Sequence, residues 1–149
     1  MLVIGDGPAR ARLEGEARAL GLERSVSFLG WVAHDLLPPF WRIADVGLLP
    51  FHRCPHIDTT LANKLFDYMA VGLAVLASDA APMVRVLGET GAGMLFRAGS
   101  ADEFAGALAT LLDDFRARRE MGDRGRRAVD ETYNWARDSQ RLLEVMERP

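Results

Sequence analysis

Residues 58–79 read DTTLANKLFDYMAVGLAVLASD, and this stretch joins a helix pattern directly to the pattern of a buried strand. Residue types that cap helices occupy positions 58–60, and Gly72 stands where a helix typically ends. Apolar residues recur every fourth residue on one face of this helix: Leu61, Leu65 and Met69. Residues 73–77 are apolar without polar alternation, as expected of a strand buried on both faces. We therefore predict a helix of about three turns that leads into a strand of a parallel sheet.

The polar face of this predicted helix has two interpretations. Asn63 and Asp67 are four residues apart, and Lys64 borders the same face. The first turn of a helix attracts anions, so one interpretation places a phosphate near residues 60–64 and sugar hydroxyls on Asp67. The other is a solvated surface with a weak Lys–Asp pair, and helix chemistry alone favours this second interpretation.

Length and composition predict one domain, residues 1–149. The chain has 149 residues, of which 49% are hydrophobic, which is enough for a core. The net charge of −3 argues against nucleic acid as a partner. The single cysteine, Cys54, excludes an internal disulfide and fits a reducing compartment. No stretch approaches the ~20 apolar residues of a membrane span, so we expect a cytoplasmic protein with at most peripheral association at the inner membrane face.

Strand and helix patterns alternate along the whole chain. Further strands are expected at residues 2–5, 26–29, 45–50 and 93–96, and further helices at residues 9–20, 34–44, 83–87, 101–112, 115–131 and 134–147. This alternation predicts an α/β fold of three layers, with a doubly wound, Rossmann-like parallel sheet on which helices of residues 114–149 pack. Ligands of such sheets bind outside the carboxyl ends of the strands, where we expect residues 5–8, 30–32, 50–60 and 78–81 to gather.

Three features of the first 31 residues lead to further predictions. Residues 2–4 already have the pattern of a buried strand, so we expect that an N-terminal portion is missing. Gly5 and Gly7 begin a dinucleotide-binding fingerprint, but Arg10 occupies its third glycine position, which makes this signal weak. Trp31 follows Gly30 at the carboxyl end of a predicted strand, so it is the tryptophan that we consider as a ligand contact rather than as core packing.

The loop before the central helix contains two histidines and the cysteine. His52, Cys54 and His56 are spaced by two, but no fourth ligand is evident, so we predict that no metal is bound here. We interpret His56 instead as a residue that lines the cleft and donates a hydrogen bond to a phosphate or sugar hydroxyl. An ordinary surface histidine is the alternative interpretation.

Six short motifs are weak signals individually, but as an ordered set they are specific for one protein family. They are LVIGDGP at 2–8, VSFLGWV at 26–32, ADVGLLP at 44–50, TTLANKLFDYMAVGLAVLASD at 59–79, GAGMLF at 91–96 and YNWA at 133–136. The set resembles the C-terminal, donor-binding domain of the family-4 retaining glycosyltransferases of GT-B type, the glycosyl transferases group 1. The resemblance covers nearly the whole chain. It implies the C-terminal half of a GT-B fold that lacks its first β-α unit, which in this family bears an arginine and a lysine that neutralise the diphosphate.

The resemblance also implies roles for residues around the central helix. Asp67 matches the second acid of the family's E-x7-E motif and would hold the ribose hydroxyls. Thr59 stands where the family has the first acid, with Asp58 one residue away. Asn63 and Lys64 would lie near the diphosphate, and the backbone around Thr59 and Thr60 would meet sugar and phosphate. Lys64 and His56 are the residues we expect to take part in catalysis.

Other ligand contacts would come from the N-terminal part of the chain. The segment that contains Gly30, Trp31 and Val32 matches a loop that contacts the base, and Gly7 belongs to a glycine-rich turn that closes one side of the pocket.

The function implied is transfer of a sugar from a nucleotide-diphosphate sugar to a glycan or lipid-linked acceptor, with retention of configuration, as in polysaccharide biosynthesis. The resemblance implies no cofactor and no metal. The acceptor would be held by an N-terminal domain that is missing, so the chain alone would be inactive. Two alternatives stay open: a non-catalytic nucleotide-binding subunit that needs a partner chain, and a sugar-nucleotide epimerase, for which only His56 is an acid/base candidate.

Overall fold

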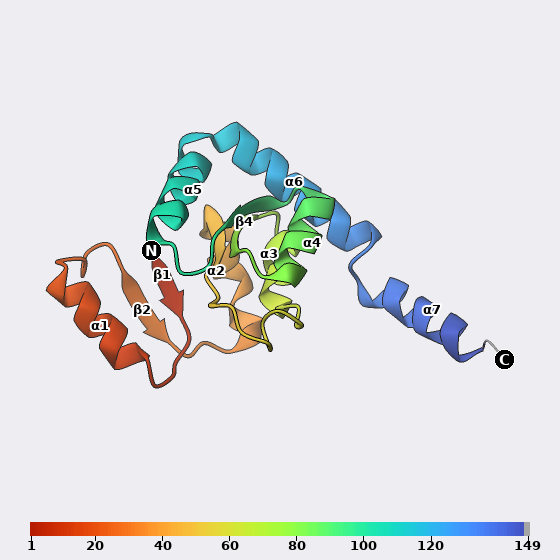
Figure 1. Cartoon of the computed structure of the whole chain (residues 1–149), viewed down its shortest axis with the longest axis horizontal. Helices are drawn as coiled ribbons and strands as arrows, with labels where there is room; N and C mark the ends of the chain where they lie inside the picture. The colour runs from red at the N-terminus through yellow and green to blue at the C-terminus, as the bar shows by residue number, and fades with distance from the viewer. Residues whose placement is uncertain (148–149) are drawn as a thin grey trace. The chain divides into compact units, whose positions relative to one another are not determined.

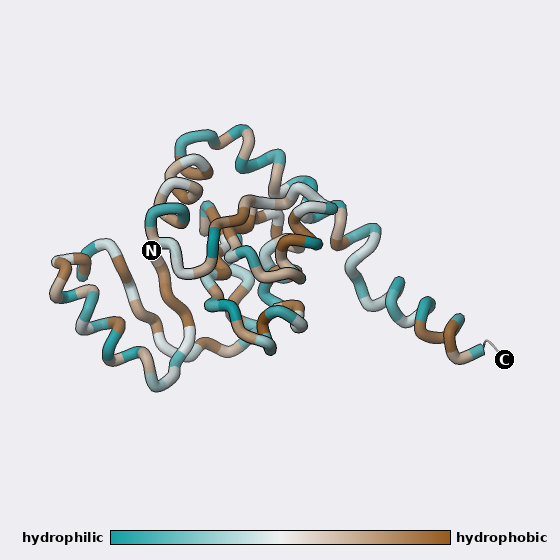
Figure 2. Tube along the Cα trace, viewed as in Figure 1, coloured by the Kyte–Doolittle hydropathy of each residue, from teal (hydrophilic) through white to brown (hydrophobic). Residues whose placement is uncertain are grey.

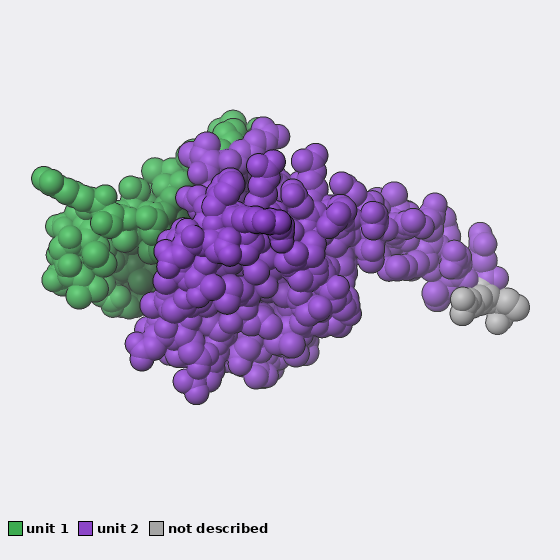
Figure 3. Space-filling view, turned by 90° about the horizontal axis from the view of Figure 1, so that it is seen from above, with its two compact units in different colours: residues 1–40 green, residues 41–149 purple. Residues whose placement is uncertain are grey.

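A computed structural model describes residues 1–147 of the chain as two compact units. Unit 1 comprises residues 1–40 and unit 2 begins at residue 41 (Figure 3). Unit 1 contains β1 (Leu2–Ile4), α1 (Arg10–Ala19), β2 (Ser27–Gly30) and the short 3-10 helix η1 (His34–Leu36). Its two strands pair in parallel, with Leu2 opposite Ser27 and Ile4 opposite Gly30. The helix α2 (Pro38–Ile43) contains the boundary between the units.

Unit 2 holds the larger sheet, of three parallel strands in the order β3-β4-β5. Its elements are β3 (Val46–Leu49), α3 (Asn63–Ala70), β4 (Ala74–Ser78), α4 (Ala81–Thr90), β5 (Gly93–Phe96), α5 (Ala101–Asp113), α6 (Phe115–Glu131) and α7 (Trp135–Met146). All five residues of the central strand β4 are buried, which explains its continuous apolar pattern. Figure 1 shows α3, α4, α5 and α6 arranged around these strands.

The core of unit 2 has two apolar layers, one on each face of the sheet. Alternate residues of β4 point to opposite faces, so Val75 and Ala77 pack with α3 and α4, whereas Ala74 and Leu76 pack with α5. These layers confirm the predicted three-layer α/β architecture with parallel strands. We predicted a single sheet, but the structure contains two, because β1 and β2 form a sheet of their own.

The last two helices differ in their packing. The helix α6 crosses both α3 and the sheet, and at Gly122 an added Cβ would overlap the carbonyl oxygen of Gly72 at the end of α3. A side chain is therefore excluded at this crossing. By contrast, α7 has no buried residue, and Figure 2 shows both hydrophilic and hydrophobic segments along it.

The predicted start of the central helix is wrong by about one turn, since α3 begins only at Asn63. The hydroxyl of Thr59 donates to the backbone carbonyls of Pro55, at 2.9 Å, and His56, at 3.2 Å. Thr59 therefore closes a turn instead of capping the helix. The helix cap is Ala62, whose backbone is extended, at φ −77° and ψ 124°. The helix has about two turns rather than three.

Candidate functional site

The carboxyl ends of β3, β4 and β5 meet at one edge of the sheet of unit 2. The strands are parallel and in register, with Leu49 opposite Ala77 and Ser78 opposite Phe96. Because α3 connects the end of β3 to the start of β4, its N-terminus lies at this same edge. A doubly wound sheet binds its ligands at such an edge, so we call it the ligand edge of unit 2.

The structure places three of the predicted site residues on α3 near the ligand edge. Asn63 and Lys64 are exposed in the first turn, and Asp67 is half-buried one turn further along. Buried Leu65 and Met69 fix the rotation of the helix, which keeps the polar face away from the core. Among the described residues, no side chain caps the first turn; the N–H of Leu65 donates to the carbonyl of Ala62 at 2.9 Å, and the amides of Asn63 and Lys64 are available to an anion.

Lys64 lies in the first turn of α3, where a lysine destabilises a helix. The N-terminal end of a helix carries a partial positive charge, and a cation there is unfavourable by roughly 0.3–1 kcal/mol. No acidic residue occupies the first turn of α3 to offset this charge. An anionic ligand would satisfy both Lys64 and the helix end, which favours the binding interpretation over a merely solvated surface.

Asp67 lies close enough to Tyr68 for its charge to act on the phenol. Burial raises the pKa of Tyr68 above its ordinary value of 10.0, and the negative charge of Asp67 raises it further. The Tyr68 ring lies over Gly47 of β3, where any side chain would overlap the ring. The next residue after Asp67 is thus held firmly against the sheet, and this limits movement of the acid.

The loop of residues 50–62 between β3 and α3 carries the other predicted residues of unit 2. Thr59 lies in a turn before the helix and Thr60 follows it, so the prediction that residues 58–60 cap the helix is wrong. The Thr60 hydroxyl is 3.5 Å from Nδ1 of His56, and both residues are exposed. The Thr59 hydroxyl is engaged by the backbone of the turn, so Thr59 presents backbone rather than side chain to a ligand.

Sequence reasoning missed one cation at this edge, Arg53. Its Nε donates to Oδ1 of Asp58 at 3.0 Å. The hydrogen bond and charge of Asp58, and then the charge of Asp79, raise the pKa of the Arg53 guanidinium above its ordinary value. Asp79 follows β4 directly, and its Oδ1 accepts the N–H of Ala98 at 2.9 Å. A spacing of five residues matches no helix or strand period, so the pairing of Arg53 with Asp58 had no sequence signal.

The predicted ligand contacts Gly7, Gly30, Trp31 and Val32 belong to unit 1. The carbonyl of Gly30 accepts the N–H of Gly5 at 2.7 Å, and Gly30 has a φ of +73° that favours glycine. Arg10 lies against Gly30, with Nη1 2.6 Å from where a Cβ would stand. Trp31 is 75% exposed. Val32 is half-buried, and Gly7 is exposed in the turn after β1.

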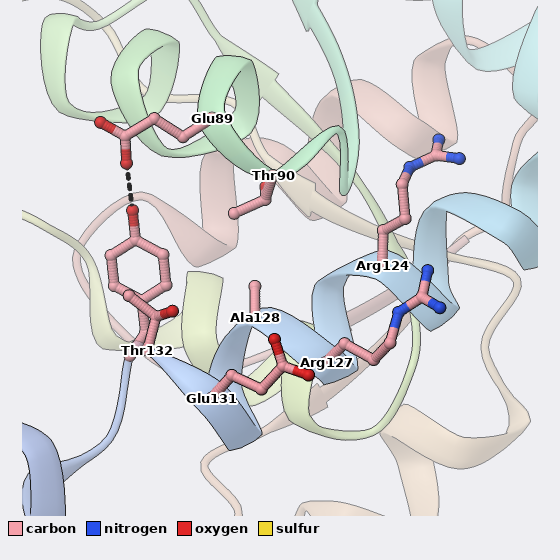
Figure 4. Close-up of a pocket in the computed structure, with 8 residues that line it drawn as sticks. Glu89, Thr90, Arg124, Arg127, Ala128, Glu131 and Thr132 are labelled. Carbon is pink, nitrogen blue, oxygen red and sulfur yellow. Dashed lines mark hydrogen bonds between the residues drawn. The ribbon is translucent and has the colours of Figure 1, made fainter.

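A hollow elsewhere in unit 2 involves none of the predicted residues. It has a volume of about 320 Å³ and is lined by Glu89, Thr90, Arg124, Arg127, Ala128, Glu131, Thr132 and Tyr133 (Figure 4). The Tyr133 hydroxyl donates to Glu89, and Nε of Arg124 donates to the carbonyl of Gly91 at 2.8 Å. These bonds tie the end of α4 to α6, so we interpret the hollow as a structural junction.

Across residues 1–147, no three histidine, cysteine, aspartate or glutamate side chains come together as a metal-binding group, so His52, Cys54 and His56 do not form one. No helix within the same residues combines the length and apolar character needed to cross a bilayer.

These features define a doubly wound α/β protein with its ligand edge at the carboxyl ends of parallel strands. The sequence model of the family described as glycosyl transferases group 1 matches residues 1–114. The chain therefore belongs to the glycosyl transferases group 1 family.

One relative agrees with this assignment, and one solved structure agrees with the fold. The chain is 29% identical over 137 residues to the GDP-mannose-dependent alpha-(1-6)-phosphatidylinositol monomannoside mannosyltransferase of Mycobacterium tuberculosis, covering 91% of this chain and 36% of the relative. The structure of Anabaena HepE in complex with UDP is similar with a TM-score of 0.85 at 19% identity, covering 97% of this chain and 40% of that one.

A third comparison concerns a single domain. The C-terminal domain of a glycosyl transferase group 1 family protein from Francisella tularensis has a TM-score of 0.71 at 22% identity, covering 85% of this chain and 63% of that one. The predicted fold, that of the C-terminal half of a GT-B protein, is confirmed. The chain spans 36% of the length of the mannosyltransferase relative.

Proposed function

We propose that this chain is the donor-binding part of a glycosyltransferase that moves a sugar from a nucleotide-diphosphate sugar to an acceptor with retention of configuration. Family membership supports sugar transfer. The name of the Mycobacterium tuberculosis relative specifies GDP-mannose, and HepE is described in complex with UDP, so nucleotide diphosphates recur among similar proteins. Family membership also favours transfer over the alternative of a sugar-nucleotide epimerase.

The observation that carries this proposal is the N-terminus of α3 at the ligand edge. Its uncapped amides and Lys64 together form a fixed positive potential, which would stabilise the negative charge that develops on a departing diphosphate. Asp67, one turn along, would accept hydrogen bonds from the ribose hydroxyls. His56 would donate to a phosphate or a sugar hydroxyl. We propose that neither a metal nor a cofactor takes part.

The acceptor side of the reaction would lie outside this chain. We propose that a glycan or lipid-linked acceptor is held by a further domain, and that the 149-residue chain binds the donor without turnover. The short span relative to the mannosyltransferase relative, 36% of its length, supports this division of roles.

Calorimetric titration of UDP, GDP and ADP into the wild type, Lys64→Ala and Asp67→Asn tests the proposal. We expect one nucleotide to bind the wild type, and Lys64→Ala to bind it roughly 10–100-fold more weakly, the size of a lost charge-assisted hydrogen bond. Asp67→Asn should lower affinity for the nucleotide but not for inorganic pyrophosphate, because it would contact the ribose. A matched control is Arg116→Ala, which removes a cation that is 89% exposed on α6.

Measuring the stability of Lys64→Ala distinguishes a loss of nucleotide binding from a loss of folding. Because a lysine is unfavourable at the start of a helix, this variant should be at least as stable as the wild type while it loses affinity. Equal nucleotide binding by wild type, Lys64→Ala and Asp67→Asn would remove α3 from the site and refute the proposed function.

A further inference from the structure

The loop of residues 50–62 is held in place although it contains no regular helix or strand. Phe51, Ile57 and Leu61 pack against the apolar core of unit 2. Within the loop, the N–H of Asp58 donates to the carbonyl of Cys54 at 2.9 Å, which forms one helix-like turn. The polar side chains of this loop are therefore carried on an ordered frame at the ligand edge.

This turn brings Arg53 and Asp58 together in a one-point contact. Only Nε of Arg53 bonds to the carboxylate, at 3.0 Å, and the structure shows no partner for the two terminal nitrogens among residues 1–147. The Arg53 side chain is 52% exposed and the Asp58 side chain 29%. The terminal nitrogens of arginine form a planar fork that suits an oxyanion with two oxygens, and this fork remains available.

The surroundings of Arg53 place it at the ends of the strands. Asp79 acts on Arg53 through its charge, and Asp79 itself bonds to the backbone of Ala98, just after β5. Arg53 is thus paired with Asp58 within the loop, and the negative charge of Asp79 at the end of β4 reaches it. Residues 50–70 contain two permanent cations, Arg53 and Lys64.

An ordinary surface ion pair is the competing explanation, and such pairs contribute little to stability. It accounts for the bond to Asp58, but it gives no role to the two terminal nitrogens of Arg53, which have no partner among residues 1–147. A diphosphate carries more charge than one lysine neutralises, so a second cation at this edge would have a partner in the proposed ligand.

We propose that Arg53 binds a second oxyanion of the sugar-nucleotide donor, with Asp58 as the positioning residue that holds its guanidinium. This inference rests on the proposed function and extends it. The oxyanion is either the β-phosphate or a carboxylate on the sugar, which have the same fork-shaped geometry.

Calorimetry with paired ligands tests this proposal on the whole chain. The probes are UMP and UDP, then UDP-glucose and UDP-glucuronate, or the guanosine and mannose equivalents if the chain prefers guanosine. Arg53→Ala should weaken UDP binding roughly 10–100-fold and leave UMP unchanged if the β-phosphate is the ligand. If the sugar carboxylate is the ligand, the loss appears with UDP-glucuronate but not with UDP-glucose. Either result supports the proposal.

Two more variants distinguish a contact from a structural role. Arg53→Lys keeps the charge without the fork, and it should recover only part of the lost affinity. Asp58→Asn should weaken the same ligand as Arg53→Ala and leave UMP binding and the thermal midpoint unchanged, whereas a structural role would shift all of them.

Two results would overturn the inference. If Arg53→Ala binds all four ligands as tightly as the wild type while Lys64→Ala weakens them, Arg53 is only a surface ion pair and the proposed function stands. If the wild type binds no nucleotide, both the proposed function and this inference fail. Arg116→Ala again serves as the control for loss of a surface cation.

Discussion

Replacing Gly122 by alanine should destabilise unit 2, although alanine is the better helix former. A Cβ at this position would overlap the carbonyl oxygen of Gly72, and it would also lie 3.6 Å from the backbone nitrogen of Ala74. The obstacle is backbone, which cannot rotate away as a side chain does. The helix α6 would therefore have to move off the end of α3 and the start of β4.

The magnitude follows from two opposing terms. Overpacking in a core costs about 1–3 kcal/mol, and an overlap with backbone belongs at the upper end, about 3 kcal/mol. Replacing glycine by alanine inside a helix gains about 1 kcal/mol. The net loss is about 2 kcal/mol, which is roughly a 30-fold change in the unfolding equilibrium.

Urea unfolding followed by circular dichroism provides the assay. With a slope of about 2 kcal/mol per molar, the midpoint should fall by about 1 M. Amide hydrogen exchange in β4 (Ala74–Ser78) should accelerate roughly 30-fold, which assigns the effect to unit 2.

Gly106→Ala is the matched control because it changes the same residue type inside α5. An added Cβ there meets nothing within 4 Å, so this variant should gain about 0.5–1 kcal/mol. If Gly122→Ala is as stable as Gly106→Ala, the close approach of α6 to Gly72 is refuted.

Two other changes test the core and the tyrosine beside Asp67. The hydroxyl of Ser78 is fully buried and has no partner among residues 1–147, so Ser78→Ala should raise the free energy of unfolding by about 1 kcal/mol; a loss of that size would indicate an undetected partner. Burial, followed by the charge of Asp67, raises the pKa of Tyr68, so the folded state holds that proton more tightly than the unfolded state. The protonated Tyr68 therefore stabilises the folded state below pH 10.0, and this stabilisation is lost as the pH rises through the folded-state pKa. Between pH 8 and about 11, the free energy of unfolding should therefore fall less for Tyr68→Phe than for the wild type. Equal losses in urea unfolding at the two pH values would contradict this.

The apolar runs of the sequence predicted the strands well. Residues 73–77 have no polar alternation, which predicted a strand buried on both faces, and β4 is such a strand. The neighbours of each strand were harder to predict. Pairing between strands is non-local, so the sequence could not show that β1 and β2 form a sheet separate from β3, β4 and β5.

The candidate site was predicted in part. Periodicity placed Asn63, Lys64 and Asp67 on a polar face because Leu65 and Met69 define the buried one. The sequence pattern failed at Thr59. A threonine hydroxyl can cap a helix or bond to the backbone of a turn, and the packing of the loop selects the turn here.

The tight crossing at Gly122 also determines which part of the site is able to adapt. Its contact with Gly72 pins the far end of α3 under α6, and Tyr68 pins the middle of the helix against β3 at Gly47. A helix of eight residues that is held at two points is rigid. Any adjustment to a bound molecule is therefore made by the exposed side chains of the loop of residues 50–62, while the helix keeps its position.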